Sequence, residues 1–149
     1  MKELKTKIIS ERIAKKIARS GLCSRRKAES LILEGKVILN NEIIRQCNIN
    51  VNDNDIILID GKPLPKSSST RLWMFFKERG YLVTENDPQG RPTIFEKLKF
   101  KTDIRLISVG RLDMNSEGLL LLTNDGKFAR KLELPSNAMS RIYRVRVHG

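Results

Sequence analysis

The first third of the chain contains two segments in which apolar residues recur at the spacing of an amphipathic helix. Over residues 13–18 the apolar positions fall on one side, and lysines and arginines fall on the other. Ser10 is a suitable N-cap, so the pattern predicts a helix over 11–19. Ser24 is a second candidate cap, and the apolar residues after it predict another helix that ends near residue 34.

Short apolar segments that follow these helices have the length of strands and are separated by turn residues. The Asn40-Asn41 pair is suited to a hairpin turn, because asparagine tolerates a positive φ. Two helices followed by short strands predict a compact α+β unit over 10–64, preceded by an N-terminal tail over 1–9. The predicted strands of this unit are 36–40, 41–44 and 55–60.

Proline, serine and lysine dominate residues 65–70, which predicts a short flexible linker. A second α+β unit follows over 71–149, and its hairpin signals favour a mixed, mainly antiparallel sheet. Thr93 and Glu96 have the spacing of a capping box, which predicts a short helix over 93–98. The predicted strands of this unit are 71–76, 81–84, 104–109, 118–123 and 142–147, and a second helix is predicted over 127–133.

The net charge of the chain gives information about its binding partner. The 149 residues carry a net charge of +12 and have a pI near 10.1, which indicates a polyanionic partner. Cations at a helix N-terminus oppose the helix dipole, so local stability does not explain the basic start of the second helix. The alternative to an anionic partner at these helices is a basic face that is only solvated. The two clusters on the predicted helices are Arg12, Lys15, Lys16 and Arg19, and Arg25, Arg26 and Lys27.

Several classes of protein are disfavoured by what the chain lacks. No apolar run approaches the ~20 residues of a membrane span, and the N-terminus lacks the apolar core of a signal peptide. We therefore expect a cytoplasmic protein with no membrane partner. Cys23 and Cys47 belong to no CxxC pair, and His148 is the only histidine, so we expect reduced thiols and no metal site.

The segment 110–118 is the candidate catalytic stretch, because Arg111 and Asp113 lie close together between glycines and directly before an apolar run. The chain offers no serine or cysteine with an adjacent base and no phosphate-binding glycine loop, which leaves carboxylate chemistry. Residue types alone favour Asp113 as an ordinary turn residue. Glycoside hydrolysis by Asp113 with Glu117 is a second interpretation, but a free sugar does not explain the basic charge.

The stretches SRRKAESLILEGKVILNN and NINVNDNDIILIDGKPL resemble the S4 RNA-binding domain over residues 10–64. In that family the two helices carry the RNA-binding face. The resemblance implies RNA contacts by Arg12, Lys15, Arg19, Arg25, Arg26 and Lys27.

The stretches FFKERGYLVTENDPQGRPTIFEKL, VGRLDMNSEGLLLLTNDGKFARKLELP and YRVRVHG resemble the RsuA/RluB family of ribosomal RNA pseudouridine synthases. The NDPQGRPTIF segment is more similar to the branch that acts on large-subunit RNA. The resemblance implies that a uridine is flipped out of its stack and that Asp113 breaks its glycosidic bond through a covalent adduct. The base then turns and rejoins the ribose through carbon 5, without a cofactor.

The same resemblance implies that Arg111 assists base flipping and RNA contact, and that Tyr143 packs against the target base; a core aromatic on a strand is the alternative for Tyr143. Members of the family continue past the position of Gly149 and there supply a basic residue that pairs with the aspartate. We therefore expect a truncated catalytic domain, doubtful activity of this chain alone, and a monomer. A non-catalytic S4-type RNA-binding protein is the alternative, and a DNA-binding protein is disfavoured because no dimeric major-groove helix stands out.

Overall fold

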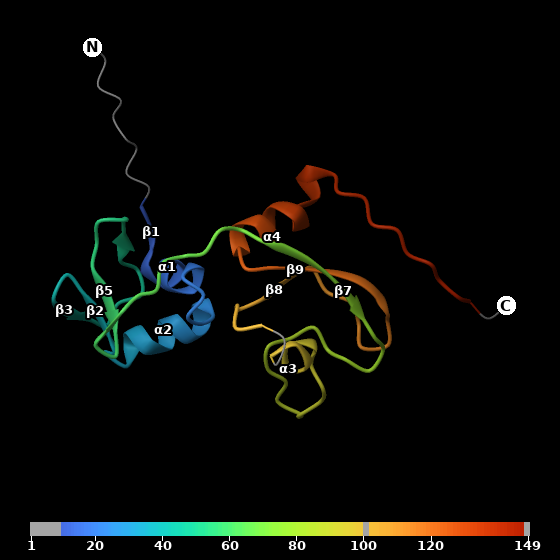
Figure 1. The fold of residues 1–149 in the computed structure, drawn as a ribbon, viewed down its shortest axis with the longest axis horizontal. Helices are drawn as coiled ribbons and strands as arrows, with labels where there is room; N and C mark the ends of the chain where they lie inside the picture. Colours follow the sequence, from blue (N-terminus) through green and yellow to red (C-terminus); the bar gives the residue numbers. More distant parts are fainter. Residues whose placement is uncertain (1–9, 100–101, 148–149) are drawn as a thin grey trace, which may run out of the picture. The chain divides into compact units, whose positions relative to one another are not determined.

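A computed structural model describes residues 10–99 and 102–147. The chain divides into two compact units between Ser69 and Thr70, and each is an α+β arrangement with antiparallel strands (Figure 1).

The first unit consists of a helical hairpin packed on short strands. The sheet has four antiparallel strands in the order β3-β2-β5-β6, and β1 pairs separately with β4. The elements are β1 Glu11–Arg12, α1 Ile13–Arg19, α2 Arg25–Leu33, β2 Val37–Leu39, β3 Glu42–Ile44, β4 Asn50–Val51, β5 Ile57–Ile59 and β6 Lys62–Pro63.

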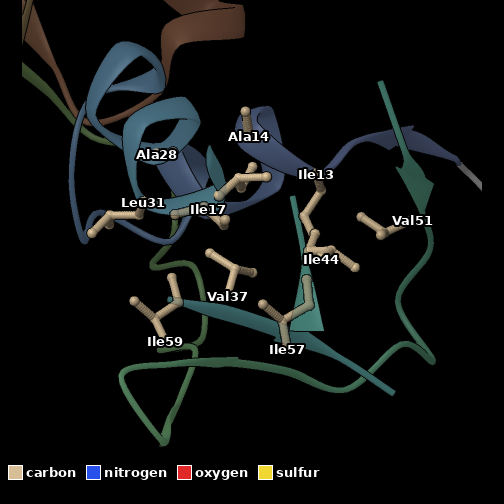
Figure 2. Close-up of a cluster of buried hydrophobic side chains, with 11 residues drawn as sticks. Ile13, Ala14, Ile17, Ala28, Leu31, Val37, Ile44, Val51, Ile57 and Ile59 are labelled. Carbon is tan, nitrogen blue, oxygen red and sulfur yellow. The ribbon is translucent and has the colours of Figure 1, made fainter. Parts of the chain in front are cut away.

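One apolar cluster holds the helices on the strands. Figure 2 shows Ile13 and Ile17 of α1 together with Val37 of β2 and Ile57 of β5, all of them buried. Because each apolar side chain of this size contributes about 1.5–3 kcal/mol when it is fully buried, the cluster can stabilise a unit this small.

Most local signals of this unit are confirmed. Asn40 and Asn41 have φ values of 48° and 74° and connect β2 to β3. The hydroxyl of Ser24 accepts a hydrogen bond from the backbone N–H of Lys27 at 3.2 Å, so it caps α2 as predicted. Short-range turn and cap chemistry therefore determines these boundaries.

The predicted start of the first helix is wrong. Glu11 and Arg12 form a strand that pairs with Asn50–Val51, and the helix begins at Ile13 without a side-chain cap. The backbone N–H of Ile13 donates to the carbonyl of Ile49 at 3.0 Å. The backbone before the helix is thus satisfied by a distant strand and not by Ser10.

The second unit has a three-stranded antiparallel sheet in the order β7-β9-β8. One face carries Trp73, Phe75, Leu120 and Leu122, which pack against the short helix α3. The elements are β7 Leu72–Lys77, α3 Ile94–Leu98, β8 Ile107–Val109, β9 Gly118–Thr123, α4 Gly126–Glu133 and a 3-10 turn η1 Pro135–Asn137.

Two predicted strands of this unit are wrong. Residues 81–84 form only an isolated bridge between Leu82 and Thr93. Residues 142–147 lie outside any strand or helix, and the side chain of Tyr143 is 64% exposed. A β-strand requires a neighbouring strand with which it forms hydrogen bonds, and no described strand pairs with either segment over its length.

Candidate active site

The loop between β8 and β9 carries Asp113 on an exposed turn. Gly110 begins the loop with a φ of 75°, a conformation that glycine adopts without steric cost. The N–H of Ser116 donates to the carbonyl of Asp113 at 3.0 Å, which closes the turn. Leu112 packs against the core of the unit, while Arg111 and Asp113 on either side of it are exposed. The loop therefore presents both polar side chains to solvent from an anchored backbone.

Lys77 holds this backbone from the opposite side. The last residue of β7 pairs in register with Gly118, where the loop rejoins the sheet. Its side chain is fully buried, and Nζ donates to the carbonyls of Asp113 at 2.9 Å and Ser116 at 2.7 Å. A third donor reaches the carbonyl of Glu78 at 3.1 Å. These bonds use the three donors of an ammonium group, as the burial of a charge requires.

Two opposing effects act on the pKa of Lys77. Burial lowers the pKa of the Lys77 ammonium below its usual value, because a charged group loses hydration in the interior. The nearby carboxylates of Asp113 and Glu117 act in the other direction and raise its pKa. The lysine is thus coupled by charge to the side chain of Asp113 and by hydrogen bonds to its backbone.

Three further contacts fix the edges of the loop. The N–H of Gly80 donates to the carbonyl of Met114 at 2.8 Å. The N–H of Gly110 donates to the carboxylate of Glu133 on α4 at 2.8 Å. On the solvent side, Arg79 pairs with Glu117 at 3.3 Å. The loop is therefore attached to β7, to the turn after it and to α4.

Lys77 and Glu133 hold the backbone of the loop, and the sequence patterns did not reveal either of them. A signal for Lys77 does exist in the alternation of β7, where Trp73 and Phe75 face the core and Lys77 follows at the same parity. For Glu133 no signal is available, since its partner Gly110 is 23 positions away.

The structure brings only part of the predicted site together. Arg111 and Asp113 share the exposed side of the loop, and no ion pair joins them within the described residues. Tyr143 lies in the exposed segment after η1 and makes no hydrogen bond or ring contact with described residues. The roles predicted for all three side chains stay predictions.

The six cations predicted to bind RNA are all exposed, but they differ in their partners. Glu11 pairs with Arg19 at 2.6 Å and with Lys15 at 3.5 Å. Arg12 and Arg25 line a shallow depression of about 300 Å³, and Arg25 begins α2 together with Arg26 and Lys27. None of these last four residues forms an ion pair with another described residue.

Within residues 10–99 and 102–147, no three His, Cys, Asp or Glu side chains are grouped as metal ligands would be. Across the same residues, no helix is long and apolar enough to cross a membrane. Cys23 and Cys47 form no disulfide.

Residues 71–149 match the RNA pseudouridylate synthase family, and residues 11–57 match the S4 domain. The first match covers more than half of the chain, so the chain belongs to the RNA pseudouridylate synthase family. An S4 domain precedes its pseudouridine synthase domain.

The relatives of the chain are longer than the chain itself. An uncharacterized RNA pseudouridine synthase of Rickettsia felis is 48% identical over 139 residues, which are 93% of this chain and 60% of the relative. The ribosomal large subunit pseudouridine synthases B of Pasteurella multocida and Vibrio cholerae are 41% and 40% identical, over 42% and 45% of their lengths and over 93% and 95% of this chain. A crystal structure of a pseudouridylate synthase is similar over 85% of this chain and 54% of its own, with 28% identity and a TM-score of 0.43. The chain thus spans about 60% of the Rickettsia relative.

Proposed function

We propose that this chain supplies the S4 domain and the aspartate-bearing part of an enzyme that converts a uridine of ribosomal RNA to pseudouridine. The observation that carries the proposal is Asp113, exposed on a loop whose backbone is held by the buried ammonium of Lys77. A nucleophile needs access to its substrate and a fixed position, and this loop offers both.

Asp113 is the proposed nucleophile. Its carboxylate forms a covalent adduct and breaks the bond between N1 of the flipped uracil and the ribose. The base turns, carbon 5 bonds to carbon 1 of the ribose, and the bond to the Asp113 carboxylate breaks, which regenerates the free carboxylate. Carbon 5 then loses its proton and N1 gains one. Because the product is an isomer of the substrate, no cofactor is consumed.

The remaining site residues have supporting roles in the proposal. Arg111, exposed two positions before Asp113, assists base flipping and contacts RNA. Tyr143 packs against the target base in the assembled enzyme. The cations of α1 and α2 bind the RNA backbone through charge-assisted hydrogen bonds.

Large-subunit RNA is the proposed substrate class. Two relatives at 41% and 40% identity are named ribosomal large subunit pseudouridine synthase B. The NDPQGRPTIF segment, which forms the loop before α3 and its capping box, is similar to that branch.

A non-catalytic S4-type RNA-binding protein is the second candidate. Tyr143, 64% exposed and without a contact to the loop, favours it, because an assembled uridine pocket needs this side chain near Asp113. The two candidates share RNA binding and differ in chemistry.

The test is the formation of pseudouridine in unmodified large-subunit ribosomal RNA, read by carbodiimide labelling and primer extension. Asp113→Asn is compared with Asp103→Asn, which removes an exposed carboxylate outside the loop. We expect product from the wild type and from Asp103→Asn, and none from Asp113→Asn. Equal product from all three would remove Asp113 from the mechanism. RNA binding without product from any of them would show that these 149 residues do not carry the activity alone.

A further inference from the structure

Half of the net positive charge lies outside the unit that matches the S4 domain. Residues 70–149 hold fifteen lysines and arginines against nine aspartates and glutamates, which leaves +6 of the chain's +12. RNA binding by the first unit alone does not account for this surplus, and like charges on one compact unit repel each other.

The surplus is concentrated at the end of the chain. Earlier in the second unit four cations form ion pairs with acids: the pairs are Arg79–Glu117, Arg91–Asp87, Lys97–Glu78 and Arg105–Glu85. Residues 127–146 contain six cations and a single acid, Glu133. The carboxylate of Glu133 accepts the N–H of Gly110, and no described cation of this segment forms an ion pair.

On α4 the cations share one side of the helix. Lys127, Arg130 and Lys131 have the spacing i, i+3 and i+4, and all are exposed. Arg141 donates from Nη2 to the carbonyl of Leu132 at 3.5 Å, which places a fourth cation at the end of the helix. The four cations form one basic surface, which we call the α4 surface.

We propose that the α4 surface binds phosphates of the RNA that carries the target uridine. The hydrogen bond from Gly110 to Glu133 joins α4 to the start of the Asp113 loop, so a strand bound on the helix lies close to that loop. The inference rests on the proposed function for the identity of the RNA, but the binding itself requires no catalysis. Phosphate contacts of this kind position an RNA without reading its sequence.

The experiment measures binding of an in vitro transcribed fragment of large-subunit ribosomal RNA by fluorescence anisotropy, from about 50 to 300 mM KCl. All variants carry Asp113→Asn, so that no modification occurs during the titration. Arg130→Gln/Lys131→Gln removes two unpaired cations of the α4 surface. Lys97→Gln/Arg105→Gln is the matched control, since it removes the same charge from the same unit at two cations that are already paired.

We expect Arg130→Gln/Lys131→Gln to weaken binding about 5–10-fold at low salt and to lower the salt slope by about 1–2. The control and the charge-retaining variant Arg130→Lys/Lys131→Arg should stay within about twofold of the parent. The side chains of Arg130 and Lys131 are exposed, so we expect a thermal unfolding curve close to that of the parent as well.

Two outcomes would overturn the inference. Equal loss in Arg130→Gln/Lys131→Gln and in the control would mean that net charge alone matters. Unchanged affinity of Arg130→Gln/Lys131→Gln for the RNA across the salt range would mean that the α4 surface does not bind its phosphates. If the binding loss is seen but Asp113→Asn forms as much pseudouridine as the wild type, the role proposed for Asp113 fails while the α4 surface stands.

Discussion

At the scale of single residues, hydrogen bonds from the ammonium of Lys77 hold the loop after β8 in place. The side chain of Asp113 is exposed, so burial does not hold it. Its backbone is held instead, because Lys77 donates to the carbonyls of Asp113 and Ser116 from beneath. Lys77 pairs with Gly118 in the sheet, at the point where the loop rejoins β9. The backbone at Asp113 is thus fixed by a residue of a strand and not by the loop alone.

Lys77→Met keeps the apolar stem of the side chain and removes its three donors. The carbonyls of Asp113 and Ser116 then lose their partner in a buried place, at a cost of about 1–3 kcal/mol. We expect the hydrogen-bonded amides of Ser116 and Gly80 to exchange with solvent about 10–100-fold faster in hydrogen-exchange mass spectrometry. Arg79→Met is the control, because Arg79 is 70% exposed and its ion pair contributes little. Equal exchange in the two variants would show that the ammonium does not hold the loop.

At the scale of elements, the sequence predicted those features whose causes are local. Thr93 and Glu96 form both hydrogen bonds of the capping box, and Asn40-Asn41 has the positive φ values of its turn. The strands predicted over 81–84 and 142–147 are wrong, although their apolar patterns are suitable. A strand forms only where its N–H and C=O groups find a partner, and a pattern within the segment contains no information about that partner.

The same distinction between local and distant causes applies to the candidate site. The loop with Arg111 and Asp113 could be found from its residues and their family resemblance. Lys77 could not be recognised as its support, since a lysine after an apolar strand is usually a surface residue. The bond between Glu133 and Gly110 depends on how α4 packs near β8, which is a property of the folded unit.

The loop between β7 and α3 is held by a carboxylate whose effect depends on pH. The side chain of Asp87 is 5% exposed and accepts from Arg91 Nη2 at 2.7 Å, from Nε at 3.1 Å and from the backbone N–H at 2.9 Å. The side-chain bond of Arg91, followed by its backbone bond, lowers the pKa of Asp87 to about 2. Because this value lies below the ~3.9 of an unfolded chain, the contribution to stability is complete above about pH 4 and is lost as pH falls toward 2.

Asp87→Asn should therefore lower the stability of the second unit at pH 6, and its difference from the wild type should shrink below about pH 4. Trp73 is the only tryptophan and lies in this unit, so its fluorescence reports urea unfolding there. Asp103→Asn is the control, and its difference from the wild type should not follow this pH profile. A difference for Asp87→Asn that is constant from pH 6 to about pH 3 would contradict the assignment.

At the scale of the whole molecule, the positive charge is divided equally between the two units, with +6 in 70–149 and the same in 1–69. Two weak contacts with one RNA, joined by a linker, increase each other's effective concentration. Within the first unit, however, the cations are not equivalent. Lys15 and Arg19 are paired with Glu11, whereas Arg25 and Arg26 have no ion pair within the described residues.

This difference predicts which cations of the first unit contribute most to RNA binding. Arg25→Gln/Arg26→Gln should weaken binding to the ribosomal RNA fragment about tenfold, whereas Lys15→Gln/Arg19→Gln should weaken it only about two- to threefold, as measured by anisotropy at low salt. The stability of the unit is an internal check. Cations at the start of α2 oppose its dipole, so their removal should leave the thermal midpoint unchanged or slightly higher, and weaker binding could not then be attributed to unfolding. Equal losses of RNA affinity in the two double variants would mean that the ion pairs with Glu11 do not reduce the contribution of Lys15 and Arg19 to RNA binding.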